Sequence, residues 1–591
     1  MRGRSCRIQS VNPYAGTRTS ATPAVSANYK WVALSNTTIA VLLSTIDSSI
    51  VLIAMPDIFR GIHLNPLQPG NFFYLLWMIL GFQIMSSVLV VSLGRLGDMF
   101  GRVRMYNFGF LVFTLASIQL TVVPLTGRGG AMWLIIGRMI QGFGAAFLVA
   151  NSSAILTDAF PPNQRGMALG INNVAAISGS FFGLVLGGVL AAINWRLVFL
   201  VSVPFGVFGT VWSYLKLREI GQRHRASIDW PGNITFAVGL ILLMIGITLG
   251  IQPAGGKPMG WSSAPVAALL AGGVGSLIAF FLIETRVAHP MFRLSLFKIR
   301  AFTFGSLATF LSAIGRGGLM FMLIIWLQGI WLPLHGYTFE QTPLWAGIFM
   351  LPLTAGFMIA GPISGFLSDR LGAKYFATAG MIGNAVGFIL LTLLPIDFHY
   401  WVFAAILLFC GLSTGVFAAP NRAAIMNSLP ARDRGAGGGM NSTFQSSAQV
   451  LSIGIFFTLM IIGLSSTLPS TLAQGLMQHG VAADVAARVA GLSTVSVLFA
   501  AFLGYNPIET LVGPGVLDHL SAADRAELTG HRFFSELISQ PFHGGLTVAF
   551  VFATVVCLVG AVASWSRGGR YIHDENDGSA ATALTDIDPN G

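Results

Sequence analysis

Among the charged residues inside long apolar runs of this chain, three have side chains that are the best placed to do chemistry. Asp47 lies in the run 33–56, Arg138 in the run 131–157 and Arg316 in the run 301–329. A charge at the centre of a membrane helix costs about 2.5–3.5 kcal/mol and is functional by default. Because removal from water disfavours the charged form of a carboxyl group, Asp47 can take up a proton and release it again.

Each of these charges also has a simpler interpretation. Arg138 is the natural ion-pair partner of Asp47, but Asp47 can instead be a structural aspartate that bonds to nearby serines of its own run. Arg316 follows Asp47 by 269 positions, and we hypothesise that it tunes Asp47 or meets an anionic part of a bound molecule. An arginine that only reaches the membrane surface or pairs with a carbonyl group is the alternative.

A cationic turn, Gly94–Arg104, separates two apolar runs and returns in weaker form at Gly365–Lys374. Its glycines let two helix ends approach closely. Asp98 can accept hydrogen bonds from N–H groups at a helix start, where the helix dipole favours an anion, and Arg102 can hold it by a charge-assisted bond. We interpret both turns as conformational latches, with charge that only sets membrane orientation as the alternative. The latch residues are Gly94, Asp98, Gly101, Arg102, Gly365, Asp369 and Arg370.

The composition places most of the chain in a membrane. Only 9% of the 591 residues are charged and 54% are hydrophobic, whereas soluble proteins carry about 25% charged residues. The 70 glycines suit close packing of membrane helices. Runs of about 20 apolar residues predict an all-α protein with fourteen spans, at 33–56, 71–94, 104–125, 131–157, 166–192, 196–216, 231–252, 264–284, 301–329, 345–367, 375–396, 401–427, 437–465 and 545–566.

Basic residues are distributed unequally between the two sides of these spans. With the N-terminus inside, 23 Lys and Arg residues fall on the cytosolic side and seven on the outer side. This asymmetry is typical of membrane proteins. It predicts that both termini are cytosolic, and it explains the net charge of +11 without nucleic acid.

Three sequence markers recur at nearly one offset. The Gly94 turn returns after 271 positions, whereas Gly142 returns at Gly411 and Pro161–Gly166 returns at Pro430–Gly435, both after 269. Six helices are therefore duplicated, with two more between the copies, as in secondary transporters. The predicted domains are a disordered tail 1–30, a six-helix bundle 31–216, a linker with two helices 217–300, a second six-helix bundle 301–566 and a disordered tail 567–591.

Residues 466–544 are too polar to lie wholly in the membrane and too apolar for a plain loop. We interpret them as a structured insertion on the outer face. The short apolar stretch Val495–Leu503 favours a re-entrant or surface-lying segment. Ser521–Asp524 resembles a capping box that opens a short helix.

Four separately placed motifs give the chain a family resemblance over about residues 31–566. The Gly94 turn resembles the signature loop of the major facilitator superfamily, and Arg138–Ala146 resembles its helix-four motif. Gly170 with Gly179–Gly188 resembles its helix-five antiporter motif, although Leu184 stands where that motif has proline. Fourteen spans and Asp47 in the first resemble its fourteen-helix drug:proton antiporter branch.

The resemblance implies further roles. The helix-five glycines Gly170, Gly179, Gly183, Gly187 and Gly188 would seal that helix against the opposite half, unless they serve ordinary packing. Candidate linings of a central cavity are Trp77, Gln83, Asn172, Asn173, Phe181, Phe182, Gln445 and Gln449. An aromatic cavity with one carboxylate suits bulky lipophilic cations.

The sequence therefore predicts a proton-coupled exporter of lipophilic, cationic drugs or toxic compounds that works by alternating access. The alternatives are an exporter of a lipid or lipid-like metabolite, and a membrane sensor or scaffold without transport. No phosphate-binding Gly-Lys-Ser/Thr loop is present, so the proton gradient is the expected energy source. We expect a monomer in the bacterial cytoplasmic membrane, with no enzyme activity, cofactor, metal or nucleic-acid partner.

Overall fold

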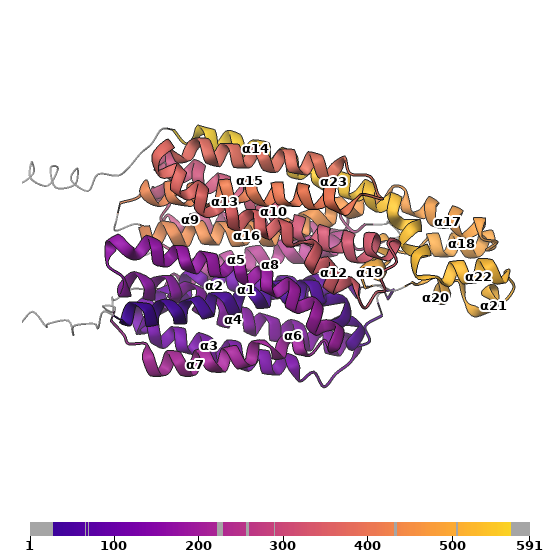
Figure 1. Cartoon of the computed structure of the whole chain (residues 1–591), viewed down its shortest axis with the longest axis horizontal. Helices are drawn as coiled ribbons and strands as arrows, with labels where there is room; N and C mark the ends of the chain where they lie inside the picture. The colour runs from indigo at the N-terminus through magenta and orange to yellow at the C-terminus, as the bar shows by residue number, and fades with distance from the viewer. Residues whose placement is uncertain are drawn as a thin grey trace, which may run out of the picture.

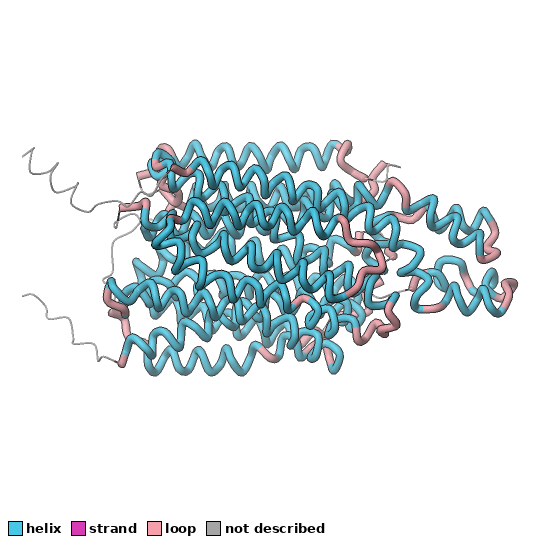
Figure 2. Tube along the Cα trace, turned by 45° about the horizontal axis from the view of Figure 1, so that its top comes forward, coloured by secondary structure: helices cyan, strands magenta, loops and turns pink. Residues whose placement is uncertain are grey.

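The computed structural model describes residues 28–65, 67–68, 70–220, 228–255, 259–288, 290–430, 434–503 and 506–568. Every regular element in these ranges is helical. Fourteen of the described helices are long and apolar enough to cross a membrane, which confirms the expected number of spans. The long helices run side by side, and most loops gather at the two ends of the molecule (Figures 1 and 2).

The first six spans form the N-terminal bundle, the lower part of Figure 1. They are α1 (Tyr29–Gly61), α2 (Phe72–Phe100), α3 (Arg102–Thr121), α4 (Gly127–Ala159), α5 (Pro162–Ile193) and α6 (Leu197–Leu200) continued by α7 (Ser202–Lys216). Two inserted spans follow, α8 (Trp230–Ile251) and α9 (Ala264–Glu284), and then the short helix η1 (Leu294–Lys298).

The C-terminal bundle repeats the arrangement in the upper part of Figure 1. One span combines α10 (Arg300–Trp326), the π-turn η2 (Leu327–Trp331) and α11 (Leu332–Leu334), and the next combines α12 (Thr342–Phe349) and α13 (Leu351–Leu371). The others are α14 (Ala373–Thr392), α15 (Tyr400–Asn427), α16 (Arg434–Ser465) and α23 (His531–Ser566).

The duplication is visible in the contacts between helices. A methyl group added to Gly142 of α4 would collide with the carbonyl oxygen of Phe82 of α2. A methyl group on Gly411 of α15 would likewise collide with the carbonyl oxygen of Leu353 of α13. These pairs are related by the offsets found in the sequence. Small residues thus bring the same two helices together in both bundles.

Residues between α16 and α23 form a cluster of short helices at one end of the molecule, here called the insertion end (Figure 1). The helices are α17 (Leu468–Gln478), α18 (Ala483–Ala490), α19 (Thr494–Phe502), α20 (Ile508–Val512), α21 (Pro514–Leu517) and α22 (Ala522–Thr529). The long helix α23 begins at His531, so residues 531–544 of the predicted insertion are helical and continuous with the last span. The predicted cap is confirmed: Ser521 Oγ accepts a hydrogen bond from the Asp524 N–H at 3.1 Å.

Helix α19 is a wedge between the two bundles and does not lie on the surface. All nine of its residues are buried, and it is bent by 84° from α18. The Phe499 ring lies 5.7 Å from that of Phe59 in α1 and 6.0 Å from that of Phe72 in α2. The Phe502 ring lies 5.8 Å from that of Phe321 in α10. The insertion therefore joins both bundles at this end.

The inserted span α8 packs against α2 of one bundle and α16 of the other. It is anchored at the end opposite to the insertion, here called the latch end. Ser92 of α2 donates to the Asn233 side chain of α8, and Arg95 of α2 donates to the Pro290 carbonyl. Glu284, the last residue of α9, accepts a hydrogen bond from the Phe292 N–H at 3.0 Å. Polar bonds thus attach the inserted helices to the N-terminal bundle.

We expect Phe499→Ala to lower the melting temperature of the purified protein. Replacing a buried phenylalanine by alanine removes about 3–5 kcal/mol of packing free energy. Here the change also removes the ring contacts of α19 with α1 and α2. Phe366→Ala is the control, because the Phe366 ring is 62% exposed. Equal melting temperatures for the two variants would contradict a stabilising role for the packing of α19 between the two bundles.

Candidate functional site

Asp47 and Arg138 form an ion pair inside the N-terminal bundle. The Arg138 Nη1 atom donates to Asp47 Oδ2, which joins α4 to α1. The two side chains are 0% and 2% exposed, respectively. The guanidinium also lies 4.3 Å from the centre of the Phe82 ring of α2. A pair so completely removed from water depends on mutual neutralisation, since each charge alone would be strongly destabilising there.

Neutral polar groups complete the surroundings of the Asp47 carboxylate. Gln141 Nε2 donates to Asp47 Oδ1 at 2.8 Å and to Ser117 Oγ of α3 at 2.9 Å, while its own Oε1 accepts from Arg138 Nη1 at 2.5 Å. Ser202 Oγ of α7 donates to Asp47 Oδ1 at 3.4 Å. The hydrogen-bond network around this carboxylate therefore connects four helices, α1, α3, α4 and α7. Gln141 could have been found in the sequence, because it stands one helical turn after Arg138.

The expected alternative for Asp47, bonding to serines of its own helix, is not what the structure contains. Ser49 Oγ donates instead to the carbonyl oxygens of Thr45 and Ile46. The carboxylate is bound entirely by residues from other helices. Protonation of Asp47 would remove the negative charge that holds Arg138, so a proton here acts on the contact between α1 and α4.

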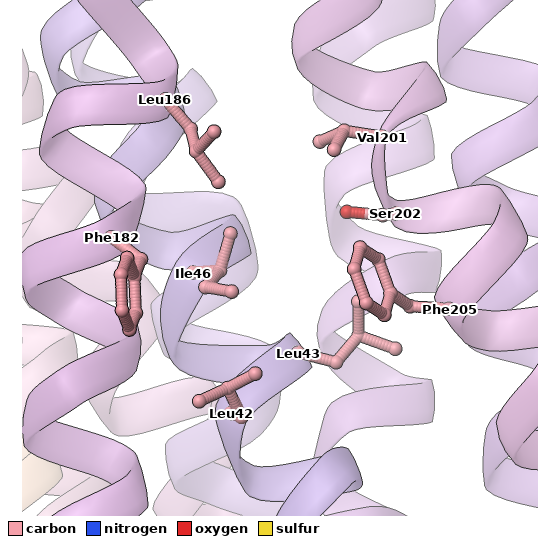
Figure 3. Close-up of a pocket in the computed structure, with 8 residues that line it drawn as sticks. All are labelled: Leu42, Leu43, Ile46, Phe182, Leu186, Val201, Ser202 and Phe205. Carbon is pink, nitrogen blue, oxygen red and sulfur yellow. The ribbon is translucent and has the colours of Figure 1, made fainter.

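An apolar cavity lies on the other side of Ser202, between α1, α5 and α7 (Figure 3). Its volume is about 210 Å³, and it is lined by Leu42, Leu43, Ile46, Phe182, Leu186, Val201, Ser202 and Phe205. An apolar cavity of about 150 Å³ binds benzene, whereas drug-sized ligands occupy about 300–1,000 Å³. This cavity can hold one ring or chain segment. Of the predicted lining residues, Phe182 borders it.

The glycine stripe of α5 faces α1 of its own bundle, which corrects the expected role. Methyl groups on Gly179, Gly183 and Gly187 would stand 2.8, 2.6 and 2.8 Å from carbonyl oxygens of α1. Only glycine permits this approach. The stripe therefore packs α5 against the helix that carries Asp47, instead of sealing α5 against the opposite half.

The contact with the opposite half begins at the neighbouring residue. A methyl group on Gly188 would stand 2.7 Å from the backbone nitrogen of Leu344 in α12. One on Gly347 of α12 would stand 2.7 Å from the carbonyl oxygen of Leu184. Gly170 has nothing within 4 Å of the same position, so its expected packing role is wrong. Helix α5 thus touches α1 on one face and α12 on another.

The first cationic turn is held by ion pairs. Arg102 Nε donates to Asp98 Oδ1 at 2.9 Å, and Arg102 Nη1 donates to Asp158 Oδ1 of α4 at 2.6 Å. Gly101 has a φ of +112°, which glycine adopts readily. Asp98 was expected to accept from N–H groups at the helix start, but Glu219 does so, from Arg102 at 2.8 Å and Val103 at 3.1 Å. The sequence analysis missed Asp158 and Glu219.

The second turn has the same backbone arrangement as the first, but its charged side chains are arranged differently. Gly94 faces Ala150, and Gly365 faces Ala419, both with 3.6 Å to an added methyl group. Gly372 has a φ of +93°. Arg370 lies 5.0 Å from the centre of the Phe366 ring and makes no ion pair with a described side chain. The side chain of Asp369 lies outside the described residues.

The predicted cavity linings are spread over several helices and do not form one wall. Trp77 is buried and stacks on Phe73, and Asn172 accepts a hydrogen bond from Thr38 of α1 at 3.0 Å. Gln449 packs on Gly317 of α10. Gln83 of α2, Phe181 of α5 and Gln445 of α16 are partly buried. The side chain of Asn173 lies outside the described residues.

Arg316 lies on α10 in the C-terminal bundle and does not contact Asp47. The two Asp47 oxygens are engaged by Arg138, Gln141 and Ser202. Arg316 is partly buried, and no described side chain or carbonyl group accepts a hydrogen bond from it. In this conformation Arg316 therefore neither pairs with Asp47 nor bonds to a described carbonyl group.

We expect Gly188→Ala to impair transport and Gly170→Ala to be tolerated. Both changes raise helix propensity by about 1 kcal/mol, so the difference between them isolates the contact with α12. The measurements are melting temperature and substrate flux for each variant. Equal behaviour of the pair would contradict a close contact between α5 and α12.

We expect Asp98→Asn to leave the protein in the membrane but to abolish transport, because Arg102 loses one of its two carboxylate partners. Arg104→Gln is the matched control, since Arg104 is exposed in the same turn. Flux is compared at equal protein levels in vesicles. Full transport by a well-expressed Asp98→Asn protein would rule out the latch.

Comparison with known proteins identifies relatives of this chain. The model of the Major Facilitator Superfamily matches residues 37–453. Multidrug resistance protein 3 of Bacillus subtilis is 27% identical over 74% of this chain and 80% of its own length. The Tetracenomycin C resistance and export protein of Streptomyces glaucescens is 25% identical over 91% of both chains, and the riboflavin transporter RibZ of Clostridioides difficile is 27% identical over 72% and 87%.

Solved structures agree on the fold. A bacterial homologue of the human lysosomal transporter Spinster, in an inward-facing conformation, aligns with a TM-score of 0.58 at 14% identity, over 93% of this chain and 100% of that one. The match of the family model, the two repeated bundles and the fourteen spans lead to one conclusion. The chain belongs to the major facilitator superfamily of membrane transporters.

Proposed function

We propose that the protein is a proton-coupled exporter of lipophilic small molecules. The observation that carries this proposal is the Asp47 carboxylate, which is completely buried and bound to Arg138 within the membrane-spanning region. A carboxylate in this position is the simplest carrier for a proton that crosses the protein. Relatives named for multidrug resistance and for antibiotic export support the direction of transport.

In the proposed cycle, a proton that reaches Asp47 from outside neutralises the carboxylate and frees Arg138. The contact between α1 and α4 then loosens. Because the glycine stripe ties α1 to α5, and Gly188 ties α5 to α12, this change reaches the opposite bundle. Release of the proton on the cytosolic side restores the ion pair. The protonation state of Asp47 thus determines whether the contacts at the insertion end or those at the latch end are favoured.

The proposal includes a location and an energy source. The latch end faces the cytosol, the insertion end faces outward, and the protein works as a monomer in the cytoplasmic membrane. The proton gradient drives the exchange without a further cofactor. The concentration of basic residues at the latch end supports this orientation.

The deciding measurement is dye efflux by the wild type and by Asp47→Asn in proteoliposomes with an imposed pH gradient. Asparagine keeps the shape of the side chain but can neither ionise nor bind a proton. We expect gradient-driven flux to be lost in the variant, and Asp57→Asn, at the other aspartate of α1, to retain it.

Other outcomes select other functions. Equal flux through the wild type and Asp47→Asn would make Asp47 structural and contradict the proposed coupling. Flux of a fluorescent lipid with no flux of dye would favour the lipid exporter. Ligand binding without any flux would favour the sensor or scaffold.

A further inference from the structure

The described aspartate side chains of the spans are already paired with arginines of the protein. Asp47 pairs with Arg138, and Asp57 pairs with Arg60 at 2.5 Å. Asp98 and Asp158 share Arg102. Among the aspartates of the spans whose side chains are described, none is left to bind a cationic molecule. The carboxylate that suggested a cationic substrate is thus occupied in the N-terminal bundle.

The C-terminal bundle has the opposite balance, with Arg316 about halfway along one of its spans. Gly305 and Thr309 lie on the face of α10 that meets α15, where Asn421 donates to them at 3.1 and 2.8 Å. Arg316 follows Thr309 by seven residues, which is two helical turns, and therefore lies on the same face. It stands sixteen residues from the start of α10, near the middle of its span.

The flanking residues of α10 face other helices. A methyl group on Gly315 would stand 3.2 Å from Cys557 Sγ of α23, and one on Gly317 would stand 3.0 Å from Ser452 of α16. Arg316 stands between these two positions, about 100° around the helix from each. It makes no ion pair or hydrogen bond with any described residue, although an arginine at this depth is normally paired.

Two further arginines lie along α15 towards the latch end. Arg567, which follows α23, is buried and donates to the Asn421 side chain and to Ser564. Arg422, next to Asn421, is exposed and has no ion-pair partner among the described residues. Arginine side chains without an acidic partner among the described residues thus lie along α15, from the latch end to the depth of Arg316.

We propose that Arg316 binds the negatively charged group of an amphiphilic organic anion, and that this class includes the transported substrate. The guanidinium group presents a planar fork of N–H donors that matches carboxylate or sulfonate oxygens. Arg422 adds a second positive charge on α15, nearer the latch end. This assignment rests on the proposed export function and replaces the cationic substrate that the sequence suggested.

Equilibrium binding to the full-length protein in nanodiscs tests the site without any gradient. The probes are fluorescein, an anion at mildly alkaline pH, and a rhodamine ester, which carries a positive charge on the same xanthene rings. We expect the wild type to bind fluorescein more tightly than the rhodamine ester. Arg316→Gln should weaken fluorescein binding at least tenfold and leave the rhodamine ester unchanged, whereas Arg316→Lys should retain most of the affinity. Arg488→Gln in α18 is the control.

Equal weakening of both dyes in Arg316→Gln would make the residue structural and overturn the proposal. So would unchanged fluorescein binding in that variant, or a wild type that prefers the rhodamine ester or binds neither dye. Binding needs no proton gradient. The dye-binding result can therefore be interpreted even if the Asp47→Asn flux experiment shows no proton coupling.

Discussion

The removal of the Asp47 and Arg138 charges from water is the constraint on which the N-terminal bundle depends. Neither charge is tolerated alone in the interior of a membrane protein, so the helices that carry them must remain in contact as long as both are ionised. Gln141, Ser117 and Ser202 bring α3 and α7 into the same network. One proton on the carboxylate therefore changes the balance of forces among four helices.

Helix α5 connects this pair to the other half of the molecule. Its three-glycine stripe lies on α1, so close to the α1 carbonyl oxygens that no side chain fits between them. Its next face touches α12 through Gly188 and Leu184. Contacts of this kind transmit displacement because close-packed interiors deform little. Helix α19 adds a second bridge at the insertion end, through phenylalanine rings that touch helices of both bundles.

The two bundles share a backbone plan but have diverged in charge. The offset of 269 that relates Gly142 to Gly411 places Arg316 at the position of Asp47 and Leu407 at the position of Arg138. Leu407 is completely buried. An acid with its own basic partner in one bundle thus corresponds to a base without an acidic partner in the other. The same divergence separates the two cationic turns, since Arg102 holds two carboxylates and Arg370 lies over an aromatic ring.

Much of this architecture could be predicted from residue types and spacing. Membrane spans follow from the length of apolar runs, the duplication follows from glycines that recur at a constant offset, and intramembrane charges are conspicuous wherever they occur. The contacts of those residues could not be predicted, because periodicity defines the faces of a helix but not the neighbour of each face. The glycine stripe of α5 therefore turned out to face α1, and Glu219, far from Arg102 in the sequence, proved to cap α3. The burial of α19 and the isolation of Arg316 likewise depend on which helices surround them, and only the packed bundle defines those neighbours.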